Sequence, residues 1–435
     1  MIKKSGYLFL GTAAVGLFEG LIMGFTYFIL FSSILFFTIA SEIIIFNAYT
    51  TSGLRSLDVQ RKVESNAIRK GGKLPVTLRF ENLSSRRIAF HYYDTLSDVF
   101  TISGPSEGYI SLGAGEVMNV SYTLSSLAVG KYVVGPVIVY SEDPMKMCLS
   151  MYKLERAIEV KVSPSLSEIN GSRTELLSNV RYSMGVHKSR VIGQGYNFYG
   201  VRPYVNSDEF RYIAWTRYGV QNGEDLYIKQ MEEERDLDVY FVIDYSISSN
   251  FGNKGKRMYD RMVISSINSA YSVLKNRDGA GFLLYSSEIE TFIRATRSDE
   301  SIRKLQREVA ELKPSGSFDL MSALKKINKE VKKDALIIIL SSMAGMDDFK
   351  IPHGSLVPVG RKLVLMIISP NEFVERRPED ANYESLIKSA LISRSMELKR
   401  LSTAFNHIGL KTLIAEDSKL QRLMVTEYQY GKMVN

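Results

Sequence analysis

Residues 237–249, which read L-D-V-Y-F-V-I-D-Y-S-I-S-S, decide the fold of this chain. Residues 239–243 are β-branched or aromatic without a polar interruption, a pattern typical of a strand buried on both faces of a parallel sheet. The run ends at Asp244, and Ser246 and Ser248 follow in the turn that leaves the strand. Ligands of open α/β sheets bind at the carboxyl ends of strands. The stretch therefore predicts a ligand site at this edge.

Asp244, Ser246 and Ser248 supply one carboxylate and two hydroxyls to the predicted edge. Hard oxygen ligands of this kind, completed by water or by a partner, suit a divalent cation such as Mg²⁺. The alternative is a buried strand followed by a serine-rich helix cap. The D-x-S-x-S spacing alone does not separate these two interpretations.

The chain after residue 236 alternates strand-like runs with helical periods. Residues 281–285, 335–340 and 363–368 are apolar runs, and residues 302–312 and 383–405 have helical spacing. This alternation predicts a doubly wound α/β domain over residues 236–435.

An apolar block at residues 7–46 contains Glu19 and Glu42 as its only charges. Roughly forty apolar residues suffice for two membrane spans. We therefore expect a transmembrane helical hairpin within residues 1–50. A cleaved signal peptide, or a single span with the rest outside, is the alternative. Basic residues flank the block on both sides and predict that the soluble domains lie in the cytoplasm: Lys3, Lys4, Arg55, Arg61 and Lys62.

Two further segments separate this block from the α/β region. Residues 56–163 contain short alternating runs such as 74–80 and 117–124, separated by glycine-rich turns, which predict an Ig-like antiparallel β-sandwich. Residues 164–235 form a polar connector rich in Gly, Arg and aromatic residues. We expect the connector to pack onto a neighbouring domain, with Trp215 buried in that contact. Direct binding of a ligand by the connector is the alternative. The predicted fold is thus multi-domain.

Composition argues against several functions. One cysteine among 435 residues excludes an intrachain disulfide, and four widely separated histidines lack the spacing of a zinc site. The net charge of +8 is spread among many acids, and no basic stretch is interleaved with stacking aromatics, so we expect no nucleic-acid partner.

The α/β region resembles a von Willebrand factor A domain. In that family D-x-S-x-S, a Thr from a second loop and an Asp from a third loop hold a divalent cation. Asp244, Ser246 and Ser248 match the first element, and Ser317 stands in place of the Thr. Ser342 stands where the third loop has its Asp. The resemblance implies a metal-ion-dependent adhesion-like site whose Mg²⁺ is held weakly or only with a partner.

The whole chain resembles the membrane protein family filed as domain of unknown function number fifty-eight. Members commonly occur beside MoxR-type AAA+ ATPases, which implies such an ATPase and unidentified client proteins as partners. Ser207 and Ala214 depart from the Gly and Asp of the family signature. The matching positions, which we expect to serve interdomain contacts, are Arg202, Tyr204, Asp208, Arg211, Ile213, Trp215 and Arg217.

Together these features predict a membrane-anchored protein-binding module that acts as an adaptor or co-chaperone of the ATPase, without catalytic residues. A metal-dependent hydrolase using the same strand-end site is the alternative. Phosphatases that use a strand-end Asp as nucleophile usually need a second carboxylate two residues later. Ser246 occupies that position, which favours the binding module.

Overall fold

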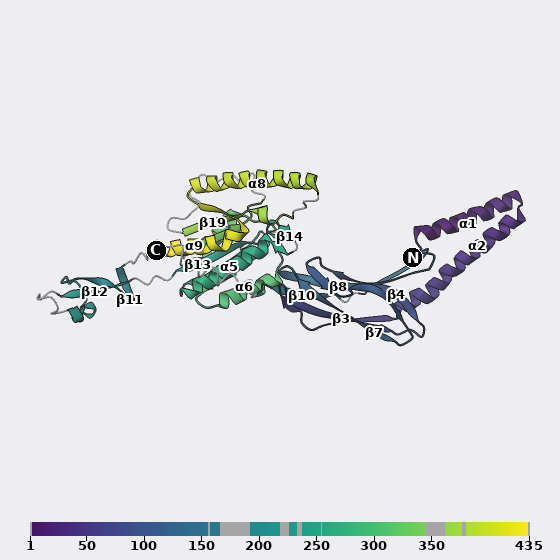
Figure 1. The fold of residues 1–435 in the computed structure, drawn as a ribbon, viewed down its shortest axis with the longest axis horizontal. Coiled ribbons are helices and arrows are strands. Elements are labelled where there is room, and N and C mark those ends of the chain that lie inside the picture. Colours follow the sequence, from purple (N-terminus) through teal and green to yellow (C-terminus); the bar gives the residue numbers. More distant parts are fainter. Residues whose placement is uncertain are drawn as a thin grey trace. The chain divides into compact units, whose positions relative to one another are not determined.

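The computed structural model describes residues 2–154, 157–165, 192–217, 226–232, 237–253, 255–344, 362–375 and 380–433. The chain divides into two compact units, which are residues 1–165 with 309–312, and residues 166–308 with 313–435. The first unit holds two apolar helices and a strand-rich region (Figure 1). The second holds the α/β region. This order confirms the predicted multi-domain organisation.

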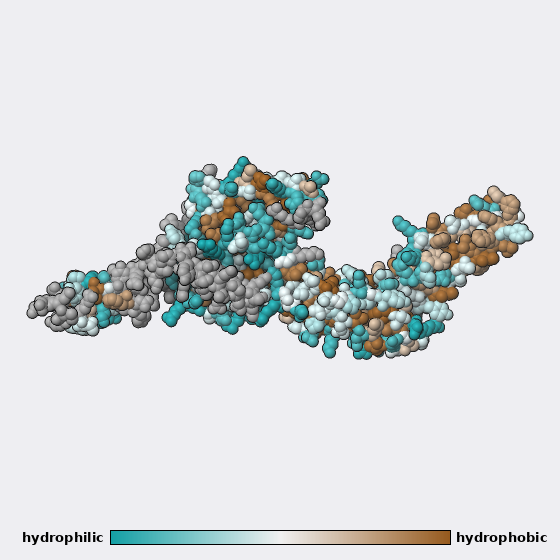
Figure 2. Space-filling view, in the orientation of Figure 1, coloured by the Kyte–Doolittle hydropathy of each residue, from teal (hydrophilic) through white to brown (hydrophobic). Residues whose placement is uncertain are grey.

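The chain begins with an antiparallel pair of apolar helices, α1 (Lys4–Met23) and α2 (Thr26–Ile45). Gly24 turns the chain between them with a positive φ of 71°, a conformation that glycine adopts without strain. The helices approach closely, since a Cβ on Gly20 would lie 2.9 Å from Ile29 Cγ1. Both helices are long and apolar enough to cross a membrane. Their surface is largely hydrophobic (Figure 2).

The base of this helical pair is joined to the β-sandwich by one turn. The turn connects β8 (Gly130–Glu142) with β9 (Leu149–Leu154), and its Met147 carbonyl accepts a hydrogen bond from the Lys3 amide at 2.7 Å. Met147 and Cys148 are buried against Ala13 of α1 and Ile39 of α2. Helix α2 also runs on towards the sandwich through a π-helical segment, η1 (Phe46–Thr51), and α3 (Ser52–Arg55).

The strand-rich region is a β-sandwich with one continuous core. Val76 and Phe80 from one sheet pack in the same buried cluster as Phe90 and Val137 from the other. The strand pairs are antiparallel except for β2 with β10, which are parallel. The first sheet has the order β1 (Leu57–Val63), β3 (Lys73–Asn82), β7 (Val117–Ser126), β5 (Phe100–Ser103). The second has the order β2 (Ala67–Arg69), β10 (Ile158–Ser163), β8, β4 (Ile88–Leu96), β6 (Glu107–Leu112), with β9 beside β8.

A buried ion pair lies inside the sandwich. The Arg61 guanidinium contacts the Asp94 carboxylate, and both side chains are at most 1 % exposed. Arg61 also donates a hydrogen bond to the Val134 carbonyl at 2.8 Å, and the Tyr122 hydroxyl donates to Asp94. The pair thus links β1, β4, β7 and β8 in a region where an isolated charge would be strongly destabilising.

We expect Asp94→Ala to destabilise the sandwich by about 3–5 kcal/mol, because it leaves the Arg61 charge buried without its carboxylate. Hydrogen exchange of β4 and β7 in the full chain measures this change. The control is Glu81→Ala, which removes an exposed pair with Arg79 and should cost less than about 1 kcal/mol. Equal protection of β4 and β7 in the two variants would contradict the assigned role of the buried pair.

The α/β region is built on a six-stranded sheet in which residues 237–249 supply a central strand. Strand β13 (Asp238–Asp244) lies between β16 and β18, and Val239 through Asp244 are all buried. Every neighbouring pair is parallel except β16 with β17. The order is β17 (Glu290–Thr296), β16 (Gly279–Tyr285), β13, β18 (Leu336–Ser341), β19 (Lys362–Ile368), β20 (Lys411–Ala415). This confirms the predicted α/β region.

Helices cover both faces of this sheet (Figure 1). Alternate residues of β13, Tyr240 and Val242, share a buried cluster with α7 (Leu320–Glu330) and α8 (Ala381–His407). On the opposite face α5 (Met258–Lys275) packs against β13 and β16, and α9 (Asp417–Met433) packs beside α5. Helix α6 (Glu300–Glu311) follows β17.

The connector contains a β-hairpin that its sequence did not reveal. Strand β11 (Ile192–Pro203) pairs antiparallel with β12 (Tyr227–Glu232). The register shifts between Gly193 and Phe198, and again before Gly200, so the side chains lose the strict alternation by which strands are recognised. Residues 166–191, 218–225 and 233–235 of the connector lie outside the described residues.

Candidate functional site

The predicted acid lies at the centre of a hydrogen-bonded group at the carboxyl edge of the sheet. Asp244 is completely buried at the end of β13. Its Oδ1 accepts hydrogen bonds from the Ser246 amide at 3.0 Å and the Ser246 hydroxyl at 2.5 Å. Its Oδ2 accepts from the Ser341 hydroxyl at 2.6 Å. Both carboxylate oxygens are therefore held by hydroxyl donors from two neighbouring strand ends.

A row of hydroxyls continues from this carboxylate. Ser246 Oγ lies 2.8 Å from Ser248 Oγ, and Ser248 Oγ lies 3.4 Å from Ser342 Oγ. Ser246 is buried, whereas Ser248 is only partly buried. The structure thus brings together the predicted Asp244, Ser246 and Ser248, and adds Ser342 at the end of the row.

Burial raises the pKa of the Asp244 carboxyl above its usual value, because removal from water disfavours the charged form more than the surrounding donors stabilise it. The opposing donors are the Ser246 and Ser341 hydroxyls and the Ser246 and Ser342 backbone amides. A cation beside the carboxylate would offset the unfavourable desolvation.

Ser341 is a member of the group that sequence reasoning missed. The register pairs Ile243 of β13 with Leu340 of β18, so Asp244 and Ser341 end neighbouring strands at the same level. The Ser341–Ser342 pair after an apolar run was visible in the sequence. Which of the two hydroxyls faces Asp244 depends on the register between β13 and β18, which no local pattern supplies.

Ser317 lies on a second loop that contacts the Asp244 loop through its backbone. The Ser315 amide donates to the Tyr245 carbonyl at 3.0 Å, and the Ile247 amide donates to the Gly316 carbonyl at 3.1 Å. The Ser317 side chain is exposed and is not part of the hydrogen-bonded group around Asp244. The structure therefore places the loop at the site and leaves the Ser317 hydroxyl at its edge.

An apolar pocket of about 600 Å³ opens directly beside the hydroxyl row. It lies between helix α8 and the segments that follow β13, β18 and β19. The short helix η4 (Ile247–Asn250) forms one wall. Ser248 and Ser342 therefore belong both to the pocket and to the hydrogen-bonded group around Asp244. The side chains lining the pocket are Ile247, Ser248, Asn250, Phe251, Met258, Ser342, Ala344, Ile368, Pro370, Val374, Ile387, Ala390, Leu391 and Arg394.

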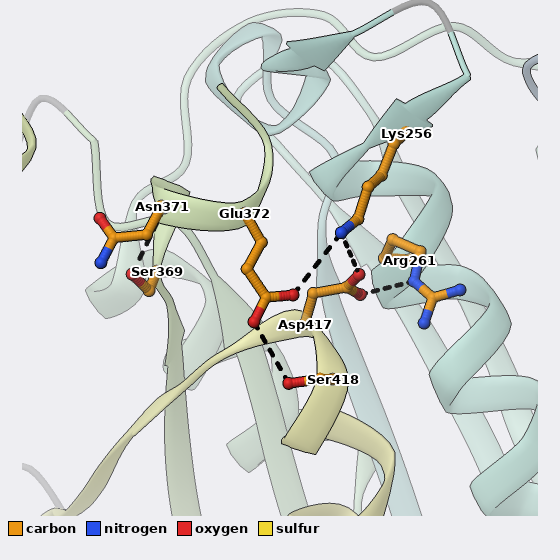
Figure 3. Close-up of polar contacts among 7 residues, drawn as sticks. All are labelled: Lys256, Arg261, Ser369, Asn371, Glu372, Asp417 and Ser418. Carbon is orange, nitrogen blue, oxygen red and sulfur yellow. Dashed lines mark hydrogen bonds and ion pairs between the residues drawn. The ribbon is translucent and has the colours of Figure 1, made fainter. Parts of the chain in front are cut away.

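An ion-pair cluster joins the loops at the same edge of the sheet (Figure 3). Lys256 lies on β15 (Lys256–Arg257), which pairs with β14 (Gly252–Asn253). Its Nζ lies 2.9 Å from Asp417 Oδ2 and 3.5 Å from Glu372 Oε2. Arg261 Nε donates to Asp417 Oδ1 at 2.5 Å. Because Glu372 belongs to η5 (Pro370–Glu372) after β19 and Asp417 follows β20, the cluster fixes the loops beside the pocket.

The signature residues of the connector form local contacts within their own hairpin. Arg202 donates to both oxygens of Asp208, at 2.7 and 2.5 Å, which lowers the pKa of the Asp208 carboxyl. Tyr204 packs near Phe210 of η2 (Phe210–Tyr212), with ring centroids 6.0 Å apart. Arg211 pairs with Glu209 at 2.5 Å. These three contacts lie within the segment that connects β11 with β12.

Trp215 was expected to be buried against a neighbouring domain, and no such burial is present within the described residues. Trp215 opens the short helix η3 (Trp215–Arg217) and is 60 % exposed. Its neighbour Ala214 is the buried residue, at 4 %, and its amide donates to the Tyr227 carbonyl at 2.7 Å. The Arg217 side chain lies outside the described residues, and the packing of the connector on a neighbour stays a prediction.

The donors at the sheet edge suit a hard cation in kind, because they are carboxylate and hydroxyl oxygens. Their total negative charge is smaller than that of a divalent cation, because Asp244 is the single carboxylate in the group. Among the described ranges, no group of three or more His, Cys, Asp or Glu side chains could hold a metal ion. Among the described residues, a cation at this site would therefore have Asp244 as its one carboxylate ligand.

Residues 200–369 match the family model described as "Protein of unknown function DUF58", in agreement with the predicted resemblance over that part of the chain. No curated protein matches this chain.

Solved structures with similarity to this chain include BatB, a conserved hypothetical protein from Bacteroides thetaiotaomicron. It shares 10 % identity over 45 % of this chain and 98 % of its own, with a TM-score of 0.29. A FixG-related protein from Vibrio parahaemolyticus shares 10 % identity over 24 % of this chain and 94 % of its own, with a TM-score of 0.18.

We expect Ser341→Ala to destabilise the α/β region by about 1–3 kcal/mol, because it removes a hydroxyl donor from a buried carboxylate. Hydrogen exchange of β13 and β18 in the full chain measures the loss. Ser317→Ala is the matched control, since it deletes an exposed hydroxyl and should change stability by no more than about 0.5 kcal/mol. Identical exchange in the two variants would show that Ser341 does not support Asp244.

Proposed function

We propose that this protein is a membrane-anchored protein-binding module and an adaptor or co-chaperone of a MoxR-type AAA+ ATPase. Its client or partner binds at the carboxyl edge of a von Willebrand factor A-like domain. The observation that carries the proposal is the Asp244 carboxylate, linked by hydroxyls to an open apolar pocket. The assignment to an ATPase partner rests on the resemblance to the DUF58 family, which residues 200–369 match.

The proposed docking site uses Mg²⁺ held by Asp244, Ser246 and Ser248, with Ser317 on the adjoining loop. One carboxylate leaves a divalent cation with excess positive charge, so the cation favours an acidic group supplied by a partner. Ser342 contributes a hydroxyl where a third-loop Asp would contribute charge. Affinity for the cation alone is then weak, and affinity for cation and partner together is higher.

Hydrolysis is less well supported at the same edge. A strand-end phosphatase needs a second carboxylate near its nucleophile to act as general acid. In this structure the position two residues after Asp244 is Ser246, whose hydroxyl is already directed to the Asp244 carboxylate. The arrangement positions oxygen ligands and offers no acid–base pair among the residues that touch Asp244.

The membrane anchor in this proposal is the pair α1 and α2, with both soluble parts in the cytoplasm. The helices are apolar along their length, and their buried residues are confined to a few contacts, such as Ala13 and Ile39. Basic residues flank the helical pair on both sides, Lys3 and Arg55 among them, and they favour a cytoplasmic position for both flanking segments.

We expect Asp244→Ala to abolish co-purification of the full chain with a co-expressed MoxR-type ATPase, because it removes the carboxylate that holds the cation. We use Asp244→Ala in place of Mg²⁺ removal by EDTA, because EDTA would also remove Mg²⁺ from the nucleotide bound to the ATPase. Asp299→Ala serves as the control, because it removes an exposed carboxylate that pairs with Arg303 and does not belong to the docking site. Undiminished co-purification with Asp244→Ala, at unchanged thermal stability, would rule out capture through this edge.

The topology is tested separately in right-side-out membrane vesicles. Protease added outside should leave the β-sandwich and the α/β region intact, because both lie on the inner side. Protease added after the vesicles are opened is the positive control. Digestion of the sandwich in sealed vesicles would contradict the cytoplasmic location.

A further inference from the structure

The turn of residues 143–148 places a cation of the β-sandwich beside the end of α1. Ser5, in the first turn of α1, donates a hydrogen bond from its hydroxyl to the Lys146 carbonyl at 2.9 Å. Lys146 is exposed, and its neighbour Met145 is 58 % exposed. Because α1 is long and apolar enough to cross a membrane, this turn lies at the level where α1 would leave the bilayer.

The turn of residues 83–87 lies in the same way beside the end of α2. The guanidinium carbon of Arg86 is 4.3 Å from the ring centroid of Tyr49, which belongs to η1, the direct continuation of α2. Arg87 is exposed, and Leu83 is 65 % exposed. Both turns therefore combine exposed cations with one large exposed apolar side chain.

The buried side chain of Asn82 fixes the shape of the turn at residues 83–87. Its Nδ2 donates to the Arg86 carbonyl at 2.7 Å, and its Oδ1 accepts from the Ser84 amide at 3.0 Å. The Leu83 amide also donates to the carbonyl of Ser56, directly after α3, at 3.0 Å. The cations of this turn are thus held in place against the base of the helical pair.

Positive charge around the base of the helical pair is in excess. The one acid of the two turns, Asp143, is buried and accepts hydrogen bonds from amides of its own turn. Lys3 is neutralised by Glu142 at 2.6 Å, whereas Arg55 donates to an uncharged partner, the Tyr152 hydroxyl, at 2.8 Å. Five exposed cations form no ion pair within the described part of the chain, and they are Lys4, Arg55, Arg86, Arg87 and Lys146.

We propose that this end of the β-sandwich binds the anionic headgroups of the membrane that holds α1 and α2. Lys and Arg side chains close to a membrane surface attract acidic lipids. Exposed apolar side chains beside them, here Leu83 and Met145, insert at the boundary between headgroups and acyl chains. The ligand is an acidic phospholipid of the bilayer, because the cations lie at the ends of two apolar helices.

This inference rests on one part of the proposed function, the membrane anchor, and is independent of the sheet edge at Asp244. Binding of headgroups by two separate turns restricts the tilt of the sandwich relative to the membrane. The two helices alone would leave that tilt to the contacts of the turns with α1 and η1.

The test reconstitutes the full chain into vesicles of equimolar phosphatidylcholine and phosphatidylglycerol. The protein is then extracted in a mild detergent, and native mass spectrometry counts the lipids that remain bound. We expect phosphatidylglycerol to exceed phosphatidylcholine by about threefold, because it carries the negative charge that the cations attract. Added salt should lower this excess by screening the charges. Equal retention of the two lipids would overturn the proposal.

Two double variants locate the binding surface. Arg86→Gln with Arg87→Gln should remove at least half of the excess of phosphatidylglycerol. Arg69→Gln with Lys73→Gln is the matched control, because it removes two exposed cations near the start of β3, about 30 Å from Asn82 at its end. Thermal unfolding confirms that both variants fold. An equal loss in both variants would show an effect of net charge alone and would contradict the assigned surface.

The outcomes separate this inference from the proposed membrane anchor. If an alkaline carbonate wash releases the chain from the vesicles, the anchor fails, and this inference fails with it. If the chain stays in the vesicles but retains the two lipids equally, this inference fails and the anchor stands. An excess of phosphatidylglycerol that falls with the Arg86 and Arg87 variant, and not with the control, supports both.

Discussion

The stability of the α/β region depends on how the buried carboxyl group of Asp244 is held. Asp244 is the last residue of a central strand, and its side chain has no exposed surface. Hydroxyls from its own turn and from the end of β18 donate hydrogen bonds to its carboxylate. An unpaired buried carboxylate is strongly unfavourable, so the turn after β13 and the end of β18 must both be placed correctly for the domain to be stable. The constraint that shapes the site is therefore also a constraint on the fold.

The same principle operates in the β-sandwich with a different solution. There the charge of Asp94 is neutralised by Arg61, and the Tyr122 hydroxyl donates a hydrogen bond to the same carboxylate. At Asp244 the neighbours are hydroxyls and amides without charge, and the pKa of the carboxyl is raised by burial. Asp94 is held by an ion pair, whereas Asp244 is held by uncharged hydrogen-bond donors. This contrast is the physical reason for assigning binding to the sheet edge.

The sequence was sufficient for features that depend on local patterns. The apolar run 239–243 predicted a buried central strand, and Asp244 and Ser246 were predicted to lie together because their spacing is set by one turn. Ser341 escaped prediction because its contact requires the register between β13 and β18. The β11–β12 hairpin escaped prediction because its register shifts break the alternation. The pocket depends on α8, far along the chain, so no motif could indicate it.

We propose that the Asp244 edge holds a divalent cation whose coordination a partner carboxylate completes. Electron paramagnetic resonance of Mn²⁺, used in place of Mg²⁺, measures this directly because free and bound ions give different signals. We expect little bound Mn²⁺ with the full chain alone and a clear increase when a short peptide that carries one Asp is added. Mn²⁺ binding that is unaffected by the peptide, or that persists in Asp244→Ala, would contradict it.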